Sequence, residues 1–316
     1  MSEKDLGDPL HSFIVCANLH PMEEEALNNL VSYYDLDNSN KKSRKGKLSI
    51  VGLGLGQATD ITVKGLQKVK NASKVYFEGY TSIMEGGRDA LVKMTGKDII
   101  IADRELIEQN SQEMFPSSDE ENVILVVGDP LSATTHVDLV SQAIQKNMSI
   151  EIVHNASILN AAGCSGLQLY SFGETVSIPF WKDNWKPDSF YDKICQNLEN
   201  GWHTLCLLDI KVKEQSEENL IRGRKIYEPA RYMMVEQASR QLVQIIKDRE
   251  VRGRPIPLDC GHKVIALARI GTKNQILKTS TLEQMMETDI GGPLHSLIIV
   301  GETHPLEDEY INMFGG

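Results

Sequence analysis

The sequence lacks any long apolar run and any excess of basic residues. No stretch of its 316 residues approaches the roughly 18 apolar residues that span a bilayer, and Met1–Asp5 has no apolar signal region. Lysine and arginine total 33 against 44 aspartate and glutamate residues, which gives a net charge of −11. Surfaces that bind nucleic acid need clustered cations. We therefore expect a soluble cytoplasmic protein that binds neither membrane nor nucleic acid.

Cysteine is scarce, and its spacing does not match the common metal and disulfide frameworks. The five residues are odd in number and contain no C-x-x-C pair: Cys16, Cys164, Cys195, Cys206 and Cys260. Cys206 lies inside an apolar run, where cysteine usually acts as a small hydrophobic residue. We expect reduced, structural cysteines and no metal site.

One segment occurs twice, once near each end of the chain. Asp5–Leu30 aligns without a gap on Asp289–Phe314, and both copies contain Leu-His-Ser and a later His-Pro. Each copy predicts a short strand, at Phe13–Val15 and at Leu297–Val300, before a helix with Pro first and acidic residues in its first turn. We interpret residues 1–46 as an extension made of this duplicate and a polar tether. The duplicate either adds a strand at a sheet edge, docks across a dimer, or is passive.

Lys47–Gly56 is an apolar strand that breaks into glycines at 52, 54 and 56. Such a loop lets a ligand or another backbone approach closely and permits positive φ. The dinucleotide fingerprint G-x-G-x-x-G needs a third glycine, but Gln57 stands there when counting from Gly52, and Thr59 when counting from Gly54. The loop predicts a ligand-facing turn or a packing turn without specifying a dinucleotide.

Apolar runs alternate with helical patterns from residue 47 onward. The expected strands are Leu48–Leu53, Lys74–Phe77, Asp98–Ala102, Asn122–Val127 and Ile150–Val153. The expected helices are Ile61–Lys70, Gly87–Met94, Arg104–Asn110 and Val137–Lys146. Continuous apolar strands joined by helices indicate a parallel sheet covered on both faces. We expect a first α/β domain at residues 47–158.

Three of these strands end in polar or glycine-rich loops. Ligands bind outside the carboxyl ends of the strands in an open parallel sheet, so the three loops should converge on one site. In the loop after the fourth strand, Gly128 permits close approach, Asp129 can accept a hydrogen bond, and Ser132 can donate one. Alternatively, Asp129 begins a simple turn and Thr135 caps the following helix.

The pattern changes after residue 158 and predicts a second α/β domain at residues 159–316. Strands are expected at 171–180, 204–210 and 264–270 in addition to Leu297–Val300, and helices at 189–198 and 231–248. These connections predict a mixed sheet. A cleft between two such domains is a common location for a small-molecule site.

Several motifs, in a fixed order, together resemble the diphthine synthase family, and in particular its eukaryotic diphthine methyl ester synthases. They are Leu48–Gly56 (LSIVGLGLG), Asp60–Leu66 (DITVKGL), Val127–Pro130 (VGDP), Ala133–His136 (ATTH), His154–Ile158 (HNASI), Phe172–Ser177 (FGETVS) and Pro293–Ser296 (PLHS). The resemblance covers residues 47 to 314. The wider relatives are the tetrapyrrole methylases, which are two-domain α/β methyltransferases.

The resemblance implies a homodimeric methyltransferase that holds S-adenosylmethionine in the cleft between its two domains. Its acceptor would be an aminocarboxypropyl-modified histidine of translation elongation factor 2, on the route to diphthamide. The eukaryotic branch adds three methyl groups to the amine and a fourth to the carboxylate. Carried over motif by motif, the cofactor contacts are Leu55, Asp129, Ser132, Ser157, Ile158, Leu208, Ile270 and His295.

The chemistry needs little from acids or bases, because a sulfonium methyl group is already activated and the enzyme mainly aligns the reactants. The base for the acceptor amine is not identified, although His136 and His154 are candidates. Without the resemblance, His295, a lone histidine beside a strand, would be interpreted as a structural histidine. Two other functions remain open: a methylase of the same group that acts on a tetrapyrrole or ribosomal RNA, and a non-catalytic nucleotide-binding module.

Overall fold

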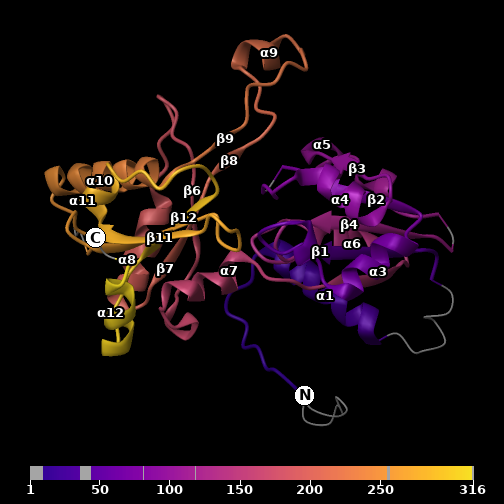
Figure 1. The fold of residues 1–316 in the computed structure, drawn as a ribbon, viewed down its shortest axis with the longest axis horizontal. Coiled ribbons are helices and arrows are strands. Elements are labelled where there is room, and N and C mark those ends of the chain that lie inside the picture. Colours follow the sequence, from indigo (N-terminus) through magenta and orange to yellow (C-terminus); the bar gives the residue numbers. More distant parts are fainter. Residues whose placement is uncertain (1–9, 36–43, 81, 118, 255–256, 315–316) are drawn as a thin grey trace.

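The chain folds around two separate β-sheets. The computed structural model describes residues 10–35, 44–80, 82–117, 119–254 and 257–314. The two sheets form two halves that stand side by side, and the chain passes between them near helix α7 (Ile158–Ala161) (Figure 1). The predicted α/β architecture, with one parallel and one mixed sheet, is confirmed.

The first sheet is entirely parallel. Its strands lie in the order β3 (Ile100–Ala102), β2 (Lys74–Glu78), β4 (Glu121–Val126), β1 (Lys47–Gly52) and β5 (Ser149–Val153). Its helices are α1 (Pro21–Asp35), α3 (Val63–Asn71), α4 (Gly87–Thr95), α5 (Arg104–Glu108) and α6 (Val137–Gln145). Every strand and helix expected between residues 47 and 153 is present, with ends shifted by at most a few residues.

Both faces of the first sheet are covered, which explains its continuous apolar strands. On β1, Val51 packs in the cluster that includes α3 and α4, whereas Leu48 and Ile50 pack in the cluster that includes α6. Alternate residues of a strand point to opposite faces, so an apolar residue is needed at nearly every position. Among the described residues, no helix combines the length and apolarity needed to span a bilayer.

The second sheet is mixed. Its order is β11 (Ile276–Thr281), β10 (Lys263–Ala268), β12 (His295–Ile299), β7 (Thr204–Leu208) and β6 (Val176–Ile178). The pair β6 and β7 is parallel and the other three pairs are antiparallel. Helices α8 (Ser189–Glu199), α10 (Val235–Val251) and α11 (Leu282–Met285) pack on one face, and α12 (Pro305–Asn312) packs on the other.

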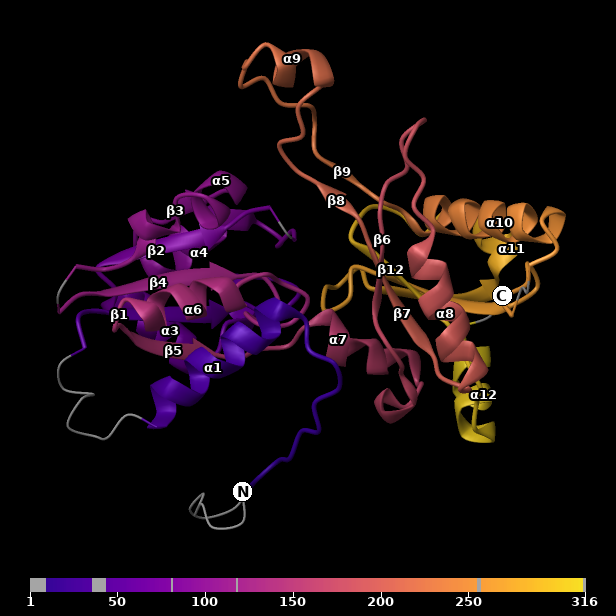
Figure 2. The ribbon, with the colours of Figure 1, turned by 180° about the vertical axis from the view of Figure 1, so that it is seen from behind.

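A two-stranded arm leaves the second sheet, and the sequence did not predict it. We use "arm" for residues 210–232, which contain β8 (Ile210–Lys211), α9 (Glu217–Ile221) and β9 (Arg231–Tyr232) and project from the second sheet, with α9 at the far end (Figure 2). The strand expected at 204–210 is therefore broken, and the helix expected at 231–248 begins only at Val235. The break lies at Asp209, whose carbonyl accepts a hydrogen bond from Met233 N at 2.9 Å.

The strand expected at 171–180 is also shorter than predicted. Leu169–Ser171 forms a 3-10 turn, and only Val176–Ile178 pairs with β7. Gly173 passes against the amide of Asn197, where an added Cβ would lie 2.2 Å from Oδ1, so this part of the chain serves loop packing.

The two copies of the repeated segment have different structures. In the C-terminal copy, β12 lies between β10 and β7, in the middle of the sheet. In the N-terminal copy, the strand predicted at Phe13–Val15 is wrong, because these residues pair with no strand among the described residues and are more than 80% exposed. Its helix α1 does form and packs on α6, with Ala26 buried. The predicted tether lies largely outside the described residues.

Candidate functional site

The loops that follow three neighbouring parallel strands are bonded to one another at one edge of the first sheet. Gly54 and Gly128 exchange two backbone hydrogen bonds, of 3.2 and 2.8 Å. Nδ2 of Asn155, after β5, donates to the carbonyl of Gly52 at 3.0 Å. The loops after β1, β4 and β5 thus converge at the carboxyl edge, where ligands of such sheets bind.

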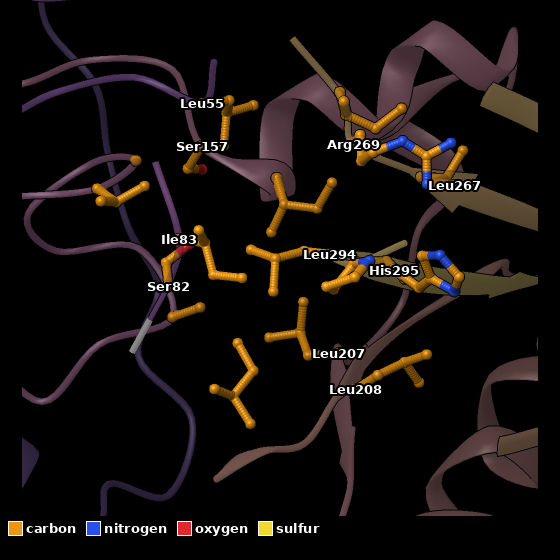
Figure 3. Close-up of a pocket in the computed structure, with 18 of the residues that line it drawn as sticks. Leu55, Ser82, Ile83, Ser157, Leu207, Leu208, Leu267, Arg269, Leu294 and His295 are labelled. Atoms are coloured by element: carbon orange, nitrogen blue, oxygen red, sulfur yellow. The ribbon is translucent and has the colours of Figure 1, made fainter. Parts of the chain in front are cut away.

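A cavity of about 840 Å³ lies between this edge and the second half. The first half contributes Leu55, Ser82, Ile83 and Ser157 to it, and the second half contributes Leu207, Leu208, Leu267, Arg269, Leu294 and His295 (Figure 3). Most of these side chains are apolar. A cavity of this size and character fits a ligand of a few tens of atoms.

The structure brings together seven of the eight cofactor contacts expected from the sequence. The residues that line the cavity are Leu55, Ser132, Ser157, Ile158, Leu208, Ile270 and His295. They come from four loops, two strands and the first residue of α7, which are distant in sequence. Asp129 is the exception, because it is buried behind the cavity wall and does not line it.

The carboxylate of Asp129 is hydrogen-bonded to groups of the protein. It accepts hydrogen bonds from the backbone N–H of Leu131 (2.9 Å) and of Asn155 (3.1 Å), and from Nδ1 of His154 (2.8 Å). Burial alone would raise its pKa, but these hydrogen bonds outweigh burial and lower the pKa below the usual range. Asp129 therefore stays ionised and holds the loop after β4 against the loop after β5.

Ser157 and Gly128 shape the wall next to Asp129. Ser157 caps α7, its Oγ accepting a hydrogen bond from Leu159 N at 3.2 Å. Gly128 has φ +82°, and an added Cβ would meet no atom nearer than 3.9 Å. Because this position lines the cavity, its missing side chain leaves room for a ligand. The predicted cap at Thr135 is wrong, since α6 begins after His136.

Two glycines at the end of β1 and in the loop after it allow close contacts between backbones. A Cβ on Gly52 would lie 2.7 Å from the carbonyl of Gly128, and one on Gly56 would lie 2.4 Å from the carbonyl of Gly271. Both distances are far below van der Waals contact. Gly52 therefore allows the loops of the first half to meet, and Gly56 allows this loop to touch the second half.

The three histidines singled out in the sequence have structural partners. Nδ1 of His295 accepts a hydrogen bond from Val235 N (3.3 Å) and Nε2 donates to Gly292 O (3.0 Å), so the buried ring has both nitrogens occupied. Burial lowers its pKa and keeps it neutral. Neither His136, which is fully buried, nor His154, which bonds to Asp129, lines the cavity.

Sequence reasoning missed several residues of the cavity, notably Tyr80, Arg104 and Lys211. Tyr80 follows β2, a fourth parallel strand whose carboxyl end lies at the same edge, so the rule applied to the other strands could have found it. Arg104 begins α5 after β3, where the same rule applies. Lys211 lies on the arm, which no pattern in the sequence predicted.

The remaining candidate chemistries can be assessed from the described part of the chain. Within it, no three His, Cys, Asp or Glu side chains are grouped as metal ligands. All five cysteines are unpaired, and burial raises the pKa of the fully buried Cys206 well above the usual range. Such a thiol is a poor nucleophile.

Comparisons with known proteins agree on one family. The model of the tetrapyrrole (corrin/porphyrin) methylases matches residues 47–251. The diphthine methyl ester synthase of Mus musculus is 53% identical over 269 residues, which cover 84% of this chain and 96% of the mouse protein. That of Dictyostelium discoideum is 49% identical over 270 residues, which cover 84% of this chain and 97% of its own length. A crystal structure of diphthine synthase has a TM-score of 0.70 and 28% identity, covering 85% of this chain and 96% of that chain.

Proposed function

Since this chain belongs to the diphthine methyl ester synthases, within the tetrapyrrole methylase family, we propose that it methylates the aminocarboxypropyl-modified histidine of elongation factor 2. It is a methyltransferase, and its methyl donor in this proposal is S-adenosylmethionine. Three transfers go to the amine and a fourth to the carboxylate. We further propose that it acts in the cytoplasm as a homodimer.

One observation carries the proposal. Seven residues from distant parts of the sequence, each expected to contact S-adenosylmethionine, line a single cavity of about 840 Å³. The cavity fits this donor in two respects. Leu55, Ile158 and Leu208 offer apolar surface for the adenosyl group, and Gly128 leaves room for a ligand at the strand ends.

The residues of the cavity support methyl transfer by binding and alignment. Bound S-adenosylmethionine supplies a methyl group that its positively charged sulfur already activates. Leu55, Ser157 and Leu208 would hold the donor, which would supply this methyl group to the acceptor nitrogen or oxygen and leave as S-adenosylhomocysteine. Apolar side chains such as Leu207 and Leu294 exclude water, and alignment of this kind can account for about 7 to 11 kcal/mol of barrier lowering.

Asp129 and His295 have supporting roles in this account. Asp129 fixes the loop that carries Gly128 and Ser132, because its carboxylate binds the neighbouring loop. His295 uses both ring nitrogens within the protein, so its contribution to the cavity wall is its backbone and the ring edge. Neither residue needs to change protonation during the reaction.

The proposal is tested with S-adenosylmethionine labelled in its methyl group. The purified protein is incubated with elongation factor 2 that carries the aminocarboxypropyl group, and separately with the unmodified factor and with a precorrin. Label should enter only the modified factor, and mass spectrometry of the histidine peptide should show up to four added methyl groups. Label in the precorrin alone would contradict the proposal. Binding of NAD without binding of S-adenosylhomocysteine would instead indicate a nucleotide-binding module.

A further inference from the structure

A second cavity, of about 780 Å³, lies beside the first, between α5 and the arm. Four residues line both cavities: Tyr80, Arg104, Ile210 and Lys211. We call the place where these four residues lie the neck. Because these residues border both cavities, a ligand bound at the neck can also extend into the first cavity.

The lining of the second cavity has the opposite charge balance to the whole chain. It contains five lysine or arginine side chains and three carboxylates, whereas the chain as a whole carries a net charge of −11. Each carboxylate is already paired with a cation: Asp103 with Lys213 at 2.7 Å, Glu105 with Lys225 at 3.2 Å, and Glu214 with Arg231 at 2.8 Å. The first two pairs also join the arm to α5. The lining therefore favours an anionic ligand.

Two cationic side chains at the neck, Arg104 and Lys211, have donor groups that can bind a ligand. The guanidinium of Arg104 lies 5.2 Å from the ring centre of Tyr80, and its side chain is 64% exposed. Its Nε lies 3.4 Å from Oε1 of Glu108. Lys211 is 34% exposed and contacts Asp209 at 3.2 Å, which leaves further donor positions on its ammonium group.

We propose that Arg104 and Lys211 bind the carboxylate of the acceptor's aminocarboxypropyl group at the neck, while the amine of the same group enters the first cavity. This inference rests on the function proposed above. A guanidinium and an ammonium group form charge-assisted hydrogen bonds to a carboxylate, and these bonds fix its orientation. Holding the carboxylate at the neck directs the neighbouring amine toward the methyl donor.

Binding of the carboxylate at the neck should affect methyl transfer to the amine and to the carboxylate differently. During transfer to the amine, the carboxylate can stay bound to Arg104 and Lys211. During esterification, a carboxylate oxygen must itself attack the methyl carbon, so it must leave the two cations. Loss of these cations should therefore slow transfer to the amine much more than transfer to the carboxylate.

The test uses Arg104→Gln and Lys211→Gln in the full-length protein. Arg222→Gln is a matched control, because Arg222 is 54% exposed, also pairs with a glutamate one helical turn away, and lines neither cavity. We expect each neck variant to raise KM for modified elongation factor 2 about tenfold, the effect of one lost charge-assisted hydrogen bond. The ratio of methyl groups on nitrogen to those on oxygen should fall, and Arg104→Lys should recover part of the loss.

Two further measurements give the decisive outcomes. The affinity for S-adenosylhomocysteine, measured by calorimetry, should stay within about twofold of the wild-type value. A large loss of this affinity would overturn the inference by assigning the two cations to the cofactor. The inference would also be overturned if the wild-type protein methylates the factor and the two neck variants have the same KM and product ratio as the wild type. If the wild-type protein transfers no methyl group to the factor, the proposed function fails as well.

Discussion

The carboxylate of Asp129 lies 2.8 Å from Nδ1 of His154, and this contact joins the loop after β4 to the loop after β5. The same carboxylate accepts two backbone N–H groups, one from each loop. The two loops carry Ser132 and Ser157, which line the cavity. A single buried anion therefore positions two walls of the cavity without lining it.

Asp129→Ala should destabilise the protein and weaken cofactor binding together. Removing the carboxylate leaves the N–H groups of Leu131 and Asn155 without their acceptor, which costs about 1 to 3 kcal/mol of unfolding free energy. Urea denaturation measures this loss, and calorimetry with S-adenosylhomocysteine measures binding. Asp183→Ala, at an exposed loop position, is the control. An unchanged urea midpoint would show that the two loops are held by other contacts.

Glu151→Gln should change the acid dependence of stability. Burial alone would raise the pKa of Glu151, but hydrogen bonds from Lys47, Lys64 and Lys68 lower it from 4.5 to about 2. A lowered pKa means that the ionised group stabilises the fold above its unfolded pKa, and that this contribution is lost as pH falls from 4.5 toward 2.

We therefore expect the stability difference between wild type and Glu151→Gln to be largest near neutral pH and to shrink below pH 4.5. Urea titrations at several pH values measure it. Glu309→Gln, at an exposed position, is the control and should show a small difference at every pH. If the stability difference for Glu151→Gln does not change with pH, the interactions of ionised Glu151 with Lys47, Lys64 and Lys68 are not its cause.

Gly56→Ala should disturb the contact between the two halves. The new Cβ would lie 2.4 Å from the carbonyl of Gly271, so one of the two backbones must move. Overpacking of this kind typically costs about 1 to 3 kcal/mol, and the movement should also weaken binding of S-adenosylhomocysteine. Gly292→Ala is a matched control near the site, because its Cβ would meet no atom within 4 Å. Equal melting temperatures for the two variants would contradict the close contact.

Deleting residues 1–44 should lower stability and leave the site intact. In α1, Ala26 is buried and Leu30 packs against the cluster that includes α6, so their loss exposes apolar surface worth about 1 to 3 kcal/mol. No residue of 10–35 lines either cavity, so affinity for S-adenosylhomocysteine should not change. A tenfold loss of that affinity would show that the extension contributes to the site.

The sequence predicted the first half of the fold well because local signals and burial agree there. The apolar run of β4 is continuous since helices cover both faces of the sheet. The strand-end rule then located the loops around Gly54, Gly128 and Asn155. The rule could not tell which way a side chain points, and so Asp129 was expected at the ligand although its carboxylate binds backbone.

The repeated segment shows that a local sequence pattern does not by itself determine whether a strand forms. Phe13–Val15 and the matching part of β12, Leu297–Ile299, are similarly apolar, but among the described residues only β12 has strands on both sides to pair with. Strand formation depends on such partners more than on propensity. The arm at 210–232 was missed for a related reason, because its polar sequence has no period and its position depends on contacts such as Lys213 with Asp103.

We propose that the cavity between the two halves holds the cofactor. A crystal structure of the protein with S-adenosylhomocysteine would show whether it does. We expect ligand density inside the first cavity, in contact with Leu55, Gly128 and Leu208, with the Asp129–His154 contact unchanged. Ligand density in the second cavity, or outside both cavities, would contradict it.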